Sequence, residues 1–213
     1  MNDPSAVIEK IQLVFGDSEY PGDAYLQGSF EGEEPFDEVE PFRGRNDWRS
    51  LEPGFLDARA GALSFFSPAA FRFYLPAYLV ADLQDQLKTA DPLFHLTHGF
   101  SEATVEIPTP LRIFRRTIGK SELVNPPRYG ATTFHDYARY RLSVFTREEA
   151  GGICAYLEYR RDAATYPFEM QPIQAALEAF WQERAQSAPT AENLRQYLAE
   201  QAEFIQAIQR KLP

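Results

Sequence analysis

Cysteine, histidine and long uncharged apolar runs are all scarce in this chain of 213 residues. Cys154 is the only cysteine, so no disulfide can form within the chain. The longest apolar run, Phe73 to Ala81, covers about half of the roughly 18 to 20 residues that cross a bilayer, and Pro76 interrupts it. The first residues lack the basic start and apolar run of a secretory signal. We therefore expect a cytoplasmic protein without a membrane segment.

Motifs of catalysis and cofactor chemistry are also missing. The end of "FRRTIGKS" matches the last letters of a phosphate-binding loop, but Phe114 stands where that loop needs a glycine. No G-x-S-x-G motif is present, and Cys154 lies about two turns into its expected helix, away from the N-terminal end that stabilises a thiolate. His95 and His98 lack a nearby third ligand, because His135 is far along the chain. We expect no catalytic residue, metal or cofactor.

Acidic charge, in contrast, is abundant and concentrated. The net charge is −10, and the nine acidic residues between Asp17 and Glu40, without a lysine or arginine, carry −9 of it. Residues 112–141 have seven basic and two acidic side chains, which gives +5. Aromatic residues interleave this basic band and could stack on bases, but the acidic remainder would repel phosphate, so we do not expect a nucleic acid partner.

Two interpretations of the acidic run stay open. It is either a solvated loop that aids solubility or a surface for a basic protein partner. The candidate partner-binding residues are Glu31, Glu33, Glu34, Asp37, Glu38 and Glu40.

The stretch "LSFFSPAAFRFYLPAYL", residues 63–79, is apolar on nearly every side. Ser67 and Pro68 form a helix start signal within it. A helix that is apolar all round and too short for a membrane is a buried helix. We therefore predict a core helix in which Phe71, Leu75 and Leu79 are inaccessible, and which Pro76 kinks or divides at Leu75.

Other segments show the period of amphipathic helices. Apolar residues recur at helical spacing over residues 7–15, after Thr146, over residues 173–181 and from about residue 191. Thr146 and Glu149 have the spacing of a capping box. The last two helices, within residues 168–213, are joined by a short turn-like segment and are expected to form a helical hairpin.

Two regions carry few helical signals. Residues 17–46, called the acidic segment below, are rich in proline and glycine and are expected to be irregular. Residues 91–141 contain five prolines and two strand-like pieces, "ATVEI" and "YRLSVF". The fold class is therefore mainly α, with one irregular helical domain over residues 1–213. We expect long loops and a C-terminal helical hairpin in this domain. The two strand-like pieces leave open a small two-stranded sheet.

Arg72 is the only charge in the aromatic stretch. Its guanidinium can stack on a neighbouring ring and needs a carboxylate partner if it is buried. The alternative is an anion-binding role in a cleft beside Pro76. The candidate ligand-binding residues for that cleft are Arg72, Tyr78, His95 and His98.

The segments "NDWRSLEPGFL", "LSFFSPAAFRFYLPAYL" and "FTREEAGGICAYLEYRR" together resemble an uncharacterised bacterial domain family. In that family a Trp-x-x-Leu segment precedes a similar aromatic core motif and a later helix. The match covers Asn46 to Arg161 and leaves out the acidic segment and the C-terminal helices. The resemblance implies a bacterial domain and no assigned activity or catalytic residue.

The sequence thus favours a non-enzymatic module that binds another protein, by analogy with small acidic immunity proteins that neutralise a basic toxin or enzyme. The alternative is an enzyme or small-ligand binder with a cleft near Arg72, Tyr78, His95 and His98. A pocket lined by several of these residues would favour the alternative. A solid core with Arg72 in an ion pair would favour the binding module. The sequence does not define the oligomeric state.

Overall fold

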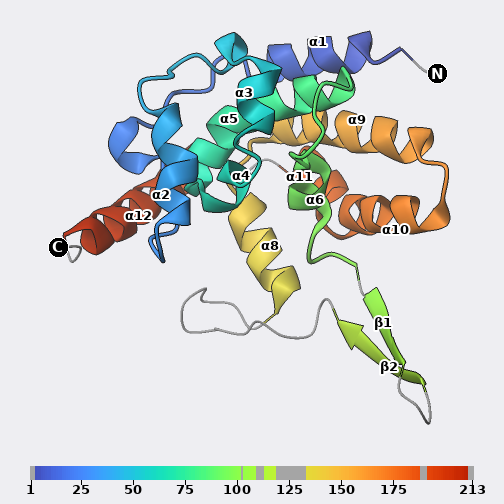
Figure 1. The fold of residues 1–213 in the computed structure, drawn as a ribbon. Helices are drawn as coiled ribbons and strands as arrows, with labels where there is room; N and C mark the ends of the chain where they lie inside the picture. Colours follow the sequence, from blue (N-terminus) through green and yellow to red (C-terminus); the bar gives the residue numbers. More distant parts are fainter. Residues whose placement is uncertain (1–2, 102, 109–112, 119–132, 188–190, 211–213) are drawn as a thin grey trace.

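Helix α5, Pro68–Leu83, lies at the centre of a mainly helical fold in the computed structural model (Figure 1). The structure describes residues 3–101, 103–108, 113–118, 133–187 and 191–210. The predicted burial of Phe71, Leu75 and Leu79 is confirmed, since each is 0% exposed. The helix is continuous through Pro76, so it is not divided at Leu75, and the alternative of a kink at Pro76 stays a prediction. Buried neighbours on nearly every side hold the helix together despite the missing N–H of Pro76.

The remaining helices pack around α5 and bury one continuous apolar core. No helix in the described part of the chain is long and apolar enough to cross a membrane. The bounds of the helices up to α8 are α1 Ser5–Val14, η1 Asp23–Tyr25, α2 Glu34–Val39, η2 Glu40–Phe42, η3 Trp48–Ser50, α3 Pro53–Asp57, α4 Ala62–Phe65, α6 Pro92–Thr97 and α8 Phe134–Leu142. The later helices are α9 Arg147–Ala163, α10 Pro167–Ala176, a π-helical turn η4 Leu177–Trp181, α11 Gln182–Gln186 and α12 Ala191–Gln209.

The acidic segment is more structured than its composition suggests. It was expected to be irregular, but it contains the short elements η1, α2 and η2, with irregular stretches between them. Leu26, Val39 and Phe42 from this segment are buried in the common core. Phe42 contacts the rings of Phe66 and Tyr74 edge-on, with ring centroids 4.8 Å apart in both pairs. This apolar anchoring offsets the low helix propensity of the sequence.

A two-stranded antiparallel sheet pairs β1, Ala103–Pro108, with β2, Ile113–Ile118. The strand-like piece "ATVEI" lies in β1, but "YRLSVF" is not a strand. Its first three residues end α8, where Ala138 and Leu142 are buried at helical spacing. The next three lead into α9, and Val144 and Phe145 among them are fully buried. The described part of residues 91–141 therefore holds α6, both strands and most of α8.

The C-terminal hairpin is a wrong prediction. The continuous helical segment of α10, η4 and α11 packs along α9, whereas α12 lies elsewhere and contacts α5 (Figure 1). Trp181 on η4 is fully buried, and its indole N–H donates to the carbonyl of Leu96 at 2.9 Å. On α12, the hydroxyl of Tyr197 donates to the carbonyl of Tyr140. Ile173, Ala176, Leu177, Phe180 and Trp181 belong to the buried core, and Leu194, Tyr197 and Leu198 of α12 are partly buried against it.

Candidate functional site

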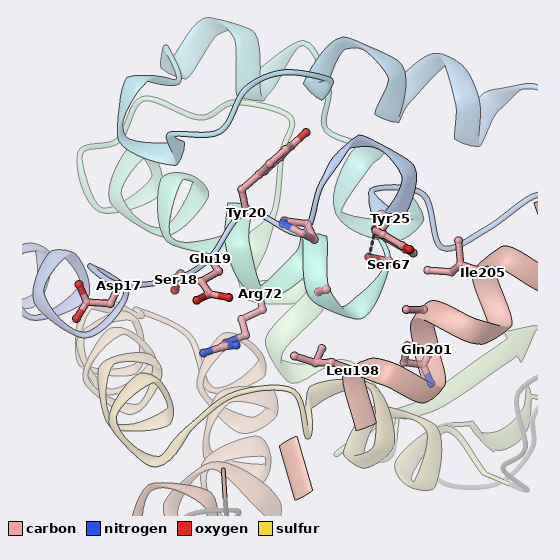
Figure 2. A pocket seen from close by; sticks show the side chains of 13 residues that line it. Asp17, Ser18, Glu19, Tyr20, Tyr25, Ser67, Arg72, Leu198, Gln201 and Ile205 are labelled. Atoms are coloured by element: carbon pink, nitrogen blue, oxygen red, sulfur yellow. Dashed lines mark hydrogen bonds between the residues drawn. The ribbon is translucent and has the colours of Figure 1, made fainter. Parts of the chain in front are cut away.

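A pocket of about 570 Å³ opens beside the N-terminal end of α5. Residues 17–28, called the strap below, form one wall, and α12 forms the opposite wall (Figure 2). Asp17, Glu19 and Arg72 gather toward one end, while Tyr25 and Ile205 lie toward the other (Figure 2). The full lining is Asp17, Ser18, Glu19, Tyr20, Pro21, Tyr25, Ser67, Ala69, Arg72, Leu198, Gln201, Ala202 and Ile205.

Backbone hydrogen bonds fix the strap to the start of α5. The amide of Ser67 donates to the carbonyl of Leu26, and the amide of Gly28 donates to the carbonyl of Phe65, both at 2.7 Å. At Gly28 a Cβ atom would lie only 2.7 Å from the carbonyl oxygen of Phe66, so a glycine permits this close approach. The Ser67 hydroxyl accepts from the amide of Ala70, which caps α5, and donates to the carbonyl of Tyr25.

The other wall is tied to the strap by side chains of α12. Gln206 donates to the hydroxyl of Tyr25 at 2.6 Å, and Gln209 donates to the carbonyl of Ala24 at 2.9 Å. Helix α12 was expected from the sequence, but its contact with residues about 180 positions earlier was not. The pocket is therefore a product of tertiary contacts between distant segments.

Arg72 is paired with the buried carboxylate of Glu149. Its Nε lies 2.9 Å from both carboxylate oxygens, and the Glu149 side chain is only 3% exposed. Glu149 also closes the capping box of α9, because its Oε2 accepts from the amide of Thr146 and the Thr146 hydroxyl accepts from the amide of Glu149. The hydroxyl of Ser18 donates to Oε1 at 3.3 Å. Glu149 thus neutralises Arg72 and joins α5, α9 and the strap.

Asp17 and Glu19 give the pocket its remaining charge. The structure assigns neither carboxylate an ion pair or hydrogen bond with another described residue, and both are exposed. Next to them, burial and the neighbouring Asp23 carboxylate raise the pKa of Tyr20 to about 12, so this hydroxyl stays protonated at neutral pH. Because Glu149 balances Arg72, the pocket has a net negative charge that comes from Asp17 and Glu19.

Of the four candidate ligand-binding residues, only Arg72 lines this pocket. Tyr78 is fully buried, its hydroxyl donates to the carbonyl of Arg59 at 3.0 Å, and burial raises its pKa far above the usual value. His95 and His98 lie on and just after α6. Because Tyr78 is 0% exposed within the core, it does not line a cleft together with the other three residues.

The two histidines share their surroundings with an arginine. Arg141 from α8 donates to the carbonyl of Leu63 and stacks on Phe71, with its guanidinium carbon 4.7 Å from the ring centroid. Burial and the positive charge of Arg141 lower the pKa of His95 to about 3 and lower that of His98 as well. Both histidines are neutral at pH 7. No group of three or more potential metal ligands occurs among the residues that the structure describes.

The six candidate partner-binding residues fall into two groups. Glu33, Glu34 and Asp37 are exposed at and on α2, and the structure gives them no ion pair within its described residues. They lie close in sequence to Phe36, which is 50% exposed. In the second group, Glu40 pairs with Arg43 and Glu31 has a partner of its own. Glu38 is half-buried, and its buried Oε2 has no hydrogen-bond partner among the described residues.

Cys154 is buried, and burial raises the pKa of its thiol to about 11. This agrees with the interpretation of an unreactive thiol that the sequence suggested.

No protein-family model, curated protein or solved structure matches the chain. The resemblance drawn from Asn46 to Arg161 therefore stays a prediction.

Proposed function

We propose that the protein is a cytoplasmic, non-enzymatic module that binds a basic partner protein through its acidic segment. The supporting observation is that this segment is folded. Leu26, Val39 and Phe42 anchor it in the core, so the carboxylates of α2 occupy defined positions on the surface. A fixed array of like charges gives a basic partner a faster and more specific encounter than a floating tail of equal charge.

The contents of α2 fit such an interface. Glu33, Glu34 and Asp37 lie within three positions of Phe36 in the sequence, and all four side chains are exposed, Phe36 by half. An aromatic side chain with a charged rim is a common arrangement at binding hot spots, because the ring is desolvated on binding while the rim charges steer the approach. Phe36 is the aromatic anchor in this proposal.

The enzyme or small-ligand alternative has weaker support. It requires several of Arg72, Tyr78, His95 and His98 in one cleft, and the pocket contains only Arg72. That arginine is ion-paired with Glu149, which is the arrangement that favours the binding module.

The test replaces three carboxylates on α2 and measures association. Glu33→Gln, Glu34→Gln and Asp37→Asn together should slow capture of a purified basic partner, identified by pull-down, about 3- to 10-fold at low salt. Association rates measured by surface plasmon resonance at low and high salt should show the difference shrinking as salt rises. The melting temperature should stay nearly unchanged, since the three side chains are exposed.

A matched control carries the same charge change on other helices, with Glu9→Gln, Glu158→Gln and Glu203→Gln, all exposed. It should slow association much less. Equal rates for the two triple variants, or a partner without a basic surface, would overturn the proposal.

A further inference from the structure

The pocket beside α5 combines two chemical environments along its length. Asp17 and Glu19 provide uncompensated negative charge at one end (Figure 2). Leu198, Ala202 and Ile205 of α12 provide an apolar wall that leads away from that end. A ligand with an aliphatic stem and a cationic head matches both parts, because the stem covers apolar surface while the head meets the carboxylates.

An anionic ligand fits less well. The guanidinium of Arg72 already contacts both oxygens of Glu149 through its Nε. At the start of α5, the Ser67 hydroxyl accepts from the amide of Ala70 and so satisfies one of the free helix amides. An anion in the pocket would also face Asp17 and Glu19. The charges therefore select for a cation.

The size of the pocket sets a limit on the ligand. A volume of about 570 Å³ lies in the range of sites that hold small organic molecules, and it accommodates one long side chain with its adjoining backbone. The hydrogen bonds that join the strap to α5 and α12 hold both walls in place before a ligand arrives. Little ordering is then needed on binding.

We propose that this pocket binds an alkyl guanidinium or ammonium group, namely the side chain of an arginine or lysine. The inference rests on the proposed function in one respect: the basic partner supplies that side chain. In this arrangement α2 steers the partner and the pocket takes up one of its cationic side chains, with the carboxylates of Glu19 and Asp17 as the acceptors.

The test uses the full chain and a defined probe, N-acetyl-L-arginine methylamide, titrated at low salt and followed by NMR amide shifts. Saturable shifts are expected at Tyr25, Ser67 and Ala202. The uncharged isostere N-acetyl-L-citrulline methylamide should bind at least about 10-fold more weakly, because it lacks the charge that the carboxylates attract. Equal titration by the two probes would overturn the inference.

Three variants locate the binding. Asp17→Asn with Glu19→Gln should weaken arginine binding about 10-fold, and Ala202→Phe, which fills the pocket without a charge change, should abolish it. Glu33→Gln with Glu34→Gln is the matched control, since it removes the same charge from α2, and it should leave probe affinity within about 2-fold. Far-ultraviolet circular dichroism shows whether each variant is folded. Equal loss in the α2 control would contradict a pocket site.

The two proposals fail in different ways. If the α2 variants slow capture of the basic partner while the arginine probe produces no saturable shifts, the proposed function stands and the pocket inference is wrong. If the probe binds as described and the partner proves not to be basic, the pocket assignment stands and the proposed function is wrong.

Discussion

Two arginines are held in different ways next to each other on α5: Arg72 by an ion pair, and Arg141 by stacking on Phe71. Arg72 itself meets the buried carboxylate of Glu149, which is also held by the cap of α9. Phe71, one position earlier, forms the surface on which Arg141 stacks. The described contacts of Arg141 are a backbone carbonyl and a ring, with the neutral His95 and His98 nearby.

The two arginines carry the same charge but should contribute to stability in different ways. A buried carboxylate and a guanidinium in close contact depend on each other, because removing either leaves the other desolvated and unpaired. A guanidinium that contacts a carbonyl and a ring leaves no buried carboxylate behind when it is removed. Arg72 and Glu149 therefore behave as a coupled ion pair that borders the pocket. The contacts of Arg141 with Phe71 and with the carbonyl of Leu63, called the Arg141 side below, act as a packing contact.

The largest expected loss of stability comes from truncating a core residue of α5 that lies near both Phe71 and Arg72. Leu75 is fully buried, one turn along α5 from Phe71 and Arg72. Leu75→Ala should lower the free energy of unfolding by about 2 to 5 kcal/mol, as other large-to-small core changes do. Chemical denaturation measures this value. A loss below about 1 kcal/mol would mean that this face of α5 is loosely packed.

A smaller effect distinguishes the two arginines directly. Arg72→Met should lower the free energy of unfolding by roughly 2 to 4 kcal/mol, because Glu149 is left buried without its cation. Arg141→Met should lower it by about 1 kcal/mol, since methionine keeps much of the packing and no carboxylate is left unpaired among the described neighbours. Denaturant titration of both variants gives the comparison.

The double variant Arg72→Met with Glu149→Gln sharpens this result. It should cost less than the sum of the two single changes, because the charges are removed together. Additive losses, or equal losses for Arg72→Met and Arg141→Met, would show that the ion pair is not a coupled unit.

A pH dependence is the third expected effect, and it belongs to the Arg141 side. The pKa of His95 falls from an ordinary 6.5 to about 3 in the folded state. Between these values the unfolded chain binds a proton that the folded chain does not, so stability decreases as the pH falls below 6.5. From pH 7 to pH 5 the loss due to His95 should be roughly 1 to 2 kcal/mol.

His95→Phe tests this assignment, because phenylalanine keeps the ring and removes the titration. The variant should lose less stability than the unchanged protein over the same pH range. Parallel stability curves for the two proteins would assign the pH dependence to other groups. The range stops at pH 5, above the ordinary pKa of carboxyl groups, so that carboxylates in general contribute little.

Local features of the fold could be predicted from the sequence. The all-round apolar pattern of residues 63–79 indicated a buried helix, and the spacing of Thr146 and Glu149 indicated a capping box that the structure contains. The need of Arg72 for a carboxylate also followed from its apolar neighbours. That Glu149 is this carboxylate could not be predicted, because the two residues are 77 positions apart and the capping role already accounted for Glu149.

The errors have related physical causes. The apolar stripes of α10 with η4 and of α12 indicate that each helix must be covered, but they do not indicate by which surface. The sequence therefore does not decide whether the two helices pack on each other. The short helix α2 forms because Val39 and Pro35 are buried, an effect of tertiary packing that residue propensities do not contain. The pocket was missed for the same reason, since the strap and α12 meet only after the chain has folded.

Glu149 has two roles, and they link ligand binding in the pocket to the stability of the first turn of α9. The same carboxylate receives the Arg72 side chain at the pocket and the backbone amide of Thr146 at the start of α9. Fraying of the first turn of α9 therefore releases one contact of the carboxylate that holds Arg72. A ligand bound by Asp17 and Glu19, on either side of Ser18, opposes that fraying, because the Ser18 hydroxyl donates to the same carboxylate. Amide hydrogen exchange at residues 146 to 150 should therefore slow when the pocket is occupied, although the ligand does not contact this end of α9.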